Sequence, residues 1–147
     1  FFTPQGKVVY GGGGIMPDYF IPLDTTRNIG SFFSELITTN VFREYTLLYY
    51  ENNKKALEKM SYKKYYNDFE VTEKMLNKLA SMAKEADIEY SQAEFDESKP
   101  ILKSRIKAWV GRSAWGNDAF YQIIYEDNDI FQKALELFDE AEDLASR

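Results

Sequence analysis

Three serine–lysine pairs in the sequence have a spacing that can support nucleophilic catalysis. The lysine follows the serine by three positions, which on a helix brings its amine within a turn of the hydroxyl and lets it act as a general base. The pairs are Ser61/Lys64, Ser81/Lys84 and Ser104/Lys107. The Ser-Asp-Asn and Lys-Thr-Gly motifs that this pattern requires are absent. We therefore interpret the pairs as solvated faces of lysine-rich helices and predict no catalytic residue in this chain.

The sequence contains neither cysteine nor histidine. It therefore lacks thiolate nucleophiles, disulfides, the usual general base and the commonest transition-metal ligand. The run Asp127-Asn128-Asp129 has the composition of a calcium-loop start, but the glycine and the glutamate that such a loop needs would fall at Gln132 and Phe138. Helix capping explains this run better, and we predict no metal and no cofactor.

Four consecutive glycines, residues 11–14, could form a nest of backbone amides for phosphate. Neither Gly-x-Gly-x-x-Gly nor Gly-Lys-Ser/Thr is present, and the glycines lead into Ile15-Met16-Pro17-Asp18 rather than into a helix start. A sharp turn or a close approach of two backbones is the better interpretation. We expect Asp18 to accept hydrogen bonds from nearby backbone amides rather than to catalyse a reaction.

Lys99, Lys103 and Lys107 are spaced by four residues and line one stripe of a predicted helix, with Arg105 and Arg112 elsewhere on it. Such a basic stripe can bind an acidic partner or nucleic acid. The net charge of −6 and the pI near 4.8 argue against general nucleic-acid binding. No segment approaches the ~20 apolar residues of a membrane span. We therefore expect no nucleic-acid partner and no membrane span.

The last predicted helix carries acids on four-residue steps that could match this stripe within the molecule. They are Glu136 with Glu140, and Asp139 with Asp143. The aromatic pairs Phe32-Phe33, Tyr49-Tyr50 and Tyr65-Tyr66 suggest an interface, because at least one ring of each adjacent pair is expected to face outward or toward another domain.

Most of the chain is predicted to be helical. From Thr25 the apolar residues recur at three- and four-residue steps, with a break at Asn40. The other predicted helix starts are Thr72, a capping box at Ser91-Gln92-Ala93-Glu94 for a short helix, Ser98 with Pro100 in the first turn of a helix that ends near Gly116, Asn117 or Asp118, and finally Asp129. A short extended link is predicted at residues 67–71. The predicted fold class is mainly α, a small helical bundle over residues 28–147.

Residues 1–27 are predicted to be extended. A turn at Pro4-Gln5-Gly6 separates two short runs rich in aromatic and β-branched residues. Such a hairpin is only marginally stable by itself. We therefore expect this β segment to be the edge of a sheet whose other strands are missing, and the chain to be a piece of a longer protein.

This segment resembles the end of the catalytic core in the carboxyl-terminal processing (tail-specific) serine proteases. Positions that match the family pattern are Phe1, Phe2, Thr3, Pro4, Gly6, Lys7, Gly14, Ile15, Pro17 and Asp18. Lys7 replaces the usual arginine, and Phe2 the usual tyrosine. The later segments 106–108, 114–116 and 131–135 look like the helical tail that a subset of bacterial members carries.

The resemblance implies a parent endopeptidase with a Ser-Lys dyad that lies upstream of Phe1, so that this fragment is inactive alone. It also implies polypeptide substrates, a periplasmic or cell-envelope location, and contacts of the tail with the rest of its own chain or with further copies. Two alternatives stay open. One is a stand-alone helical protein-interaction module without peptidase ancestry, and the other is nucleic-acid binding through the lysine stripe.

Overall fold

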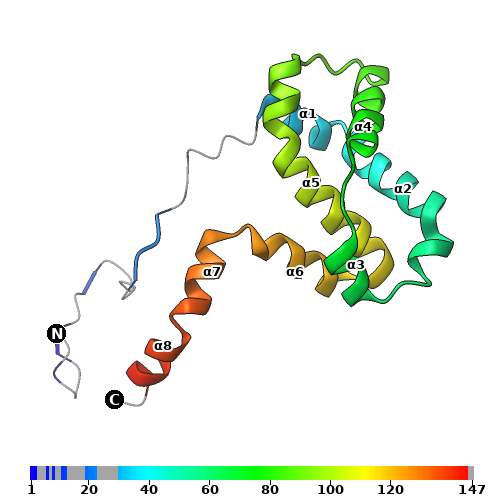
Figure 1. The fold of residues 1–147 in the computed structure, drawn as a ribbon. Coiled ribbons are helices and arrows are strands. Elements are labelled where there is room, and N and C mark those ends of the chain that lie inside the picture. The colour runs from blue at the N-terminus through cyan, green and yellow to red at the C-terminus, as the bar shows by residue number, and fades with distance from the viewer. Residues whose placement is uncertain (3–5, 7, 9–10, 13–18, 23–29, 146–147) are drawn as a thin grey trace.

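A computed structural model describes residues 1–2, 6, 8, 11–12, 19–22 and 30–145. These residues are mainly helical and contain no strand, so the predicted small helical bundle is confirmed. The helices are α1 (Ser31–Thr38), α2 (Val41–Leu57), α3 (Tyr62–Asp68), α4 (Glu73–Glu85), α5 (Gln92–Trp115), α6 (Asn117–Glu126), α7 (Asp129–Glu136) and α8 (Phe138–Ala145) (Figure 1).

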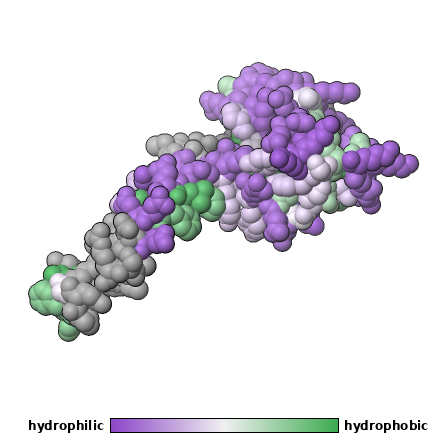
Figure 2. Space-filling view, turned by 60° about the horizontal axis from the view of Figure 1, so that its bottom comes forward, coloured by the Kyte–Doolittle hydropathy of each residue, from purple (hydrophilic) through white to green (hydrophobic). Residues whose placement is uncertain are grey.

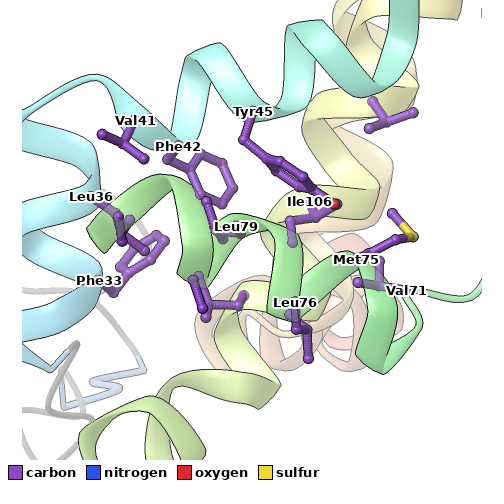
Figure 3. Packing of buried hydrophobic residues seen from close by; sticks show 14 of the residues in the cluster. Phe33, Leu36, Val41, Phe42, Tyr45, Val71, Met75, Leu76, Leu79 and Ile106 are labelled. Atoms are coloured by element: carbon purple, nitrogen blue, oxygen red, sulfur yellow. The ribbon is translucent and has the colours of Figure 1, made fainter. Parts of the chain in front are cut away.

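The bundle is built around α5, which packs against each of α1, α2, α3, α4 and α6. Apolar side chains from α1, α2, α4 and α5 itself meet in the core. Figure 3 shows Phe33 and Leu36 from α1, Phe42 from α2, Leu79 from α4 and Ile106 from α5 turned toward one another. Burial of these side chains is the main favourable term in the folding of such a bundle.

The predicted local signals at the start of α2 and of α4 are confirmed. Asn40 has a φ of 63°, in the left-handed region that separates α1 from α2. The Thr72 side chain accepts a hydrogen bond from the Met75 backbone N–H and caps α4. The predicted apolar face of α4 is buried, including Leu76 and Leu79.

The link between α3 and α4 is shorter than predicted, because α3 continues through Asp68. Helix α3 begins at Tyr62, and the side chain of Ser61 caps its N-terminus. The Ser61 hydroxyl accepts a hydrogen bond from the Lys64 backbone N–H at 3.3 Å.

The prediction of a new helix at Ser98 was wrong, since α5 is one helix from Gln92 to Trp115. The capping box is confirmed, with Ser91 and Glu94 bonding to each other's backbone N–H groups, but it starts a long helix rather than a short one. Ser98 is buried, and its hydroxyl donates to the Glu94 carbonyl at 2.8 Å. Pro100 interrupts the backbone ladder on an exposed side of the helix, where water can satisfy the free carbonyl.

The expectation that one ring of each aromatic pair faces outward was wrong for Phe32 and Phe33, which are both buried. Helix α1 lies between α5 and α2, so two of its faces are covered. Phe32 packs against Phe95 of α5, and Phe33 packs against Phe42 of α2. In the other two pairs, Tyr65 is buried and the remaining three rings are half-buried.

The single last helix that was predicted is divided at Leu137 into α7 and α8. Its cap is Asn128 rather than Asp129, because the Asn128 side chain accepts from the Phe131 backbone N–H at 2.9 Å. Figure 1 shows α7 and α8, called the arm below, leaving the bundle and running toward the N-terminal residues. The apolar face predicted for this helix is therefore exposed, and no residue of α7 is buried.

Of the predicted N-terminal β segment, the described residues contain one isolated antiparallel bridge, between Phe2 and Val8. Three described phenylalanines of this segment are largely exposed: Phe1 is 86% exposed, Phe2 76% and Phe20 81%. Gly13, Gly14, Asp18 and the predicted boundary between residues 27 and 28 lie outside the described residues.

Candidate functional site

The three serine–lysine pairs have structural roles in the bundle. Ser61 caps α3, as described above. The Ser81 hydroxyl donates to the Asn77 carbonyl at 3.0 Å, within α4. In the third pair the amine of Lys107 donates to the Tyr66 carbonyl at 2.6 Å rather than meeting Ser104. No pair brings its amine to its hydroxyl, so none is arranged as a nucleophile with its base.

The lysine stripe of α5 is used inside the molecule, but its partner differs from the predicted one. Lys99 and Lys103 each approach Glu73 of α4 at 3.3 Å, and Lys99 also pairs with Asp96 at 2.7 Å. Hydrogen bonds from Lys103 and Lys99 lower the pKa of Glu73. The predicted acids of the last helix lie on the arm, away from this stripe.

The arm acids have other contacts. Glu136 pairs with Lys133 at 2.8 Å, and the carboxylate of Glu140 accepts a hydrogen bond from the Tyr19 hydroxyl. Asp127-Asn128-Asp129 forms the junction of α6 and α7 through the Asn128 cap. Within the described part of the chain, no group of three or more acidic side chains could hold a metal ion.

A groove between α2 and α4 is the best candidate for a binding site. It has a volume of about 590 Å³, within the range of roughly 300–1,000 Å³ usual for ligand sites. Its walls come from α2, from the α3–α4 link and from α4. The lining residues are Tyr45, Leu48, Tyr49, Asn52, Asn53, Met60, Asp68, Phe69, Glu70, Thr72, Lys74, Met75 and Lys78.

Tyr45 is the most unusual of these residues. Its side chain reaches from α2 toward Ile106 of α5 (Figure 3), and only 2% of it is exposed. Its hydroxyl has no hydrogen-bond partner among the described residues, although buried hydroxyls normally have one. Burial, and then the nearby Tyr49, raise the pKa of Tyr45, and burial raises that of Tyr49.

The groove combines apolar walls with charged groups of both signs. Leu48, Phe69 and Met75 give it apolar walls, Lys74 and Lys78 stand on its α4 side, and Asp68 and Glu70 also line it. Such a site can bury apolar side chains and pair with charged groups of a ligand.

A second hollow, of about 730 Å³, lies at the turn between α4 and α5. It is wider open than the groove, and its polar groups support the start of α5. Glu94 accepts hydrogen bonds from the backbone and the hydroxyl of Ser91 and from Ser31, and these lower its pKa to about 2. The polar groups of this hollow therefore have a structural role in capping α5.

The groove was not predicted from the sequence. Its residues come from three separate segments, and each segment alone reads as an ordinary amphipathic helix or as a link. The adjacent pair Leu47-Leu48 is the one sequence feature that indicates an exposed apolar surface here, because two adjacent side chains on a helix point to different sides.

The described residues thus form a mainly helical bundle with a groove between α2 and α4. Residues 32–116 match the model of DUF8443, a family of unknown function. The match runs from α1 to the end of α5 and covers more than half of the chain, so the chain belongs to this family. No curated protein and no solved structure matches it. Among the described residues, no helix has both the length and the apolar character needed to cross a membrane.

Proposed function

We propose that the chain is the helical C-terminal domain of a carboxyl-terminal processing serine endopeptidase, with a structural and contact role rather than a catalytic one. The observation that carries this proposal is the exposure of Phe1, Phe2 and Phe20 in a segment whose described residues pair through one isolated bridge. Large exposed aromatic side chains usually mark a surface that another part of a protein covers. The motif around them is the one that resembles the end of the protease core.

In this proposal the chemistry belongs to a catalytic core upstream of Phe1. There, a lysine would accept the proton of a serine hydroxyl as the hydroxyl attacks the peptide carbonyl, the role that histidine has in other serine proteases. The internal bonding of Ser61, Ser81 and Lys107 supports a non-catalytic role for the present residues. Polypeptide substrates and a periplasmic or cell-envelope location are part of the proposal and rest on the family resemblance.

The first test is to read the gene upstream of Phe1. The proposal expects a core sequence with a serine followed about two dozen residues later by a lysine, the spacing that the resemblance implies. The companion test is to incubate the purified chain with an unfolded polypeptide, for which we expect no cleavage. Cleavage that is lost on Ser81→Ala or Ser104→Ala would contradict the proposal.

A stand-alone helical interaction module is the second candidate. The extent of the family match favours it, because residues 32–116 include the bundle and leave out the N-terminal segment. The groove between α2 and α4 suits it as well. An unrelated domain or a stop codon directly upstream of Phe1 would support this candidate over the protease domain.

A further inference from the structure

The arm has an apolar face that the described part of the chain covers only in part. Ile130, Leu135 and Phe138 are exposed, and Phe138 is 66% exposed. In Figure 2 a patch of hydrophobic side chains, drawn green, lies where the arm leaves the bundle. Within α7, helical spacing puts Ile130, Ala134 and Leu135 on one side and Asp129, Lys133 and Glu136 on the other. An amphipathic helix of this kind is stable in water only when another surface covers its apolar side.

The charge of the arm is strongly negative. Between residues 129 and 142 there is one lysine, Lys133, and the acids are Asp129, Glu136, Asp139, Glu140 and Glu142. The groove between α2 and α4 carries charged groups of both signs, with its lysines on the α4 side. Lys74 and Lys78 stand beside its apolar walls, while Asp68 and Glu70 lie on the side of the α3–α4 link.

We propose that the groove binds the arm of a second copy of this chain. The exposed leucine and phenylalanine of the arm would enter among Leu48, Phe69 and Met75, and the arm acids would face Lys74 and Lys78. An arm cannot fill the groove of its own chain in this structure, because it leaves the bundle through α6 and points away from α2 and α4 (Figure 1). Two chains that exchange arms would cover both apolar surfaces at once.

This inference does not depend on the protease ancestry, since it uses only residues 45–142. It concerns the contact between copies, and the reading of the gene upstream of Phe1 has no bearing on it. Failure of one proposal is thus distinguishable from failure of the other.

The first experiment measures the mass of the full 147-residue chain in solution by sedimentation from low to high micromolar concentration. We expect a monomer–dimer equilibrium. Lys74→Glu combined with Lys78→Glu should weaken the dimer by about tenfold, because the reversed charges repel the acidic arm. The matched control is Lys63→Glu with Lys64→Glu, which makes the same change of charge on exposed residues of α3 outside the groove and should leave the dimer unchanged.

Cross-linking gives the decisive test, because the natural chain has no cysteine. A Leu48→Cys chain is mixed with a tagged Leu135→Cys chain under mild oxidation, so that a mixed disulfide can form only between two molecules. Leu47→Cys is the matched control, since Leu47 is the preceding exposed residue of α2 and does not line the groove. We expect the mixed disulfide with Leu48→Cys and little of it with Leu47→Cys. Equal yields from the two positions, or a chain that stays monomeric at every concentration, would overturn the proposal.

Discussion

Tyr65 and Lys107 join α3 to α5 through two hydrogen bonds that run in opposite directions. The Tyr65 hydroxyl donates to the Lys107 carbonyl at 2.7 Å, and the Lys107 amine donates to the carbonyl of the neighbouring Tyr66 at 2.6 Å. The Tyr65 ring is fully buried and packs on Phe69 and Trp115. Burial raises the pKa of Tyr65. The short helix α3 is thereby fixed to the centre of the bundle.

Tyr65→Phe should destabilise the fold by about 1 kcal/mol, because it removes a buried hydrogen bond but keeps the ring in place. Chemical denaturation followed by circular dichroism measures the change. Tyr121→Phe is the matched control, since Tyr121 is exposed and should give a change near zero. An unchanged stability of the Tyr65→Phe variant would contradict the role given to this bond.

Gly116 connects α5 to α6 with a φ of 88° and a ψ of −168°, a conformation that is open almost only to glycine. Gly116→Ala should therefore cost about 1–3 kcal/mol, although the space around the residue is empty. Asp87 provides the opposite case, because its φ is already 55°. Asp87→Gly should leave stability unchanged or raise it slightly. If thermal denaturation showed the reverse order for the two variants, the backbone argument would be wrong.

We expect acid to destabilise the start of α5 by protonating the carboxylate of Glu94. Its folded-state pKa is lowered from 4.5 to about 2, so its hydrogen bonds stabilise the fold above pH 4.5 and are lost as the pH falls through 2. Glu94→Gln should flatten the decline of stability in this acid range. The control is Glu97→Gln, at an exposed glutamate of the same helix. The measurement is urea denaturation of the natural chain and of both variants at a series of acidic pH values. Equal slopes of unfolding free energy against pH for all three would contradict the role given to Glu94.

The lysine stripe should not bind nucleic acid. Lys99 and Lys103 are held by Glu73, and Lys107 by the Tyr66 carbonyl. Nucleic-acid binding depends on free cations that replace counterions along the phosphates. We expect no shift of a DNA fragment in a gel at low salt. A shift that disappears steeply with added salt would show that these ion pairs open to phosphate.

The parts of the fold that were predictable depend on local signals. Thr72, Asn40 and the Ser91–Glu94 box act within a few residues of themselves, so their roles follow from the sequence. Helix α5 continues past Pro100 and packs against five neighbouring helices, whereas a proline two residues after Ser98 favoured a new helix there. Tertiary context was decisive there.

The candidate site was less predictable than the fold. The groove needs residues of α2, of the α3–α4 link and of α4 to come together, and periodicity within one helix carries no information on such a meeting. The exposure of the arm could not be predicted from periodicity either. Its apolar spacing predicts a buried face, and the structure leaves that face open.

We propose that the catalytic groups lie outside this chain and that the bundle is a non-catalytic domain of the same protein. The most direct measurement compares the full gene product, its variant with the upstream serine changed to alanine, and the present chain in cleavage of an unfolded polypeptide. We expect cleavage by the full product and by neither of the other two. Cleavage by the present chain, or equal cleavage by the full product and its serine variant, would contradict it.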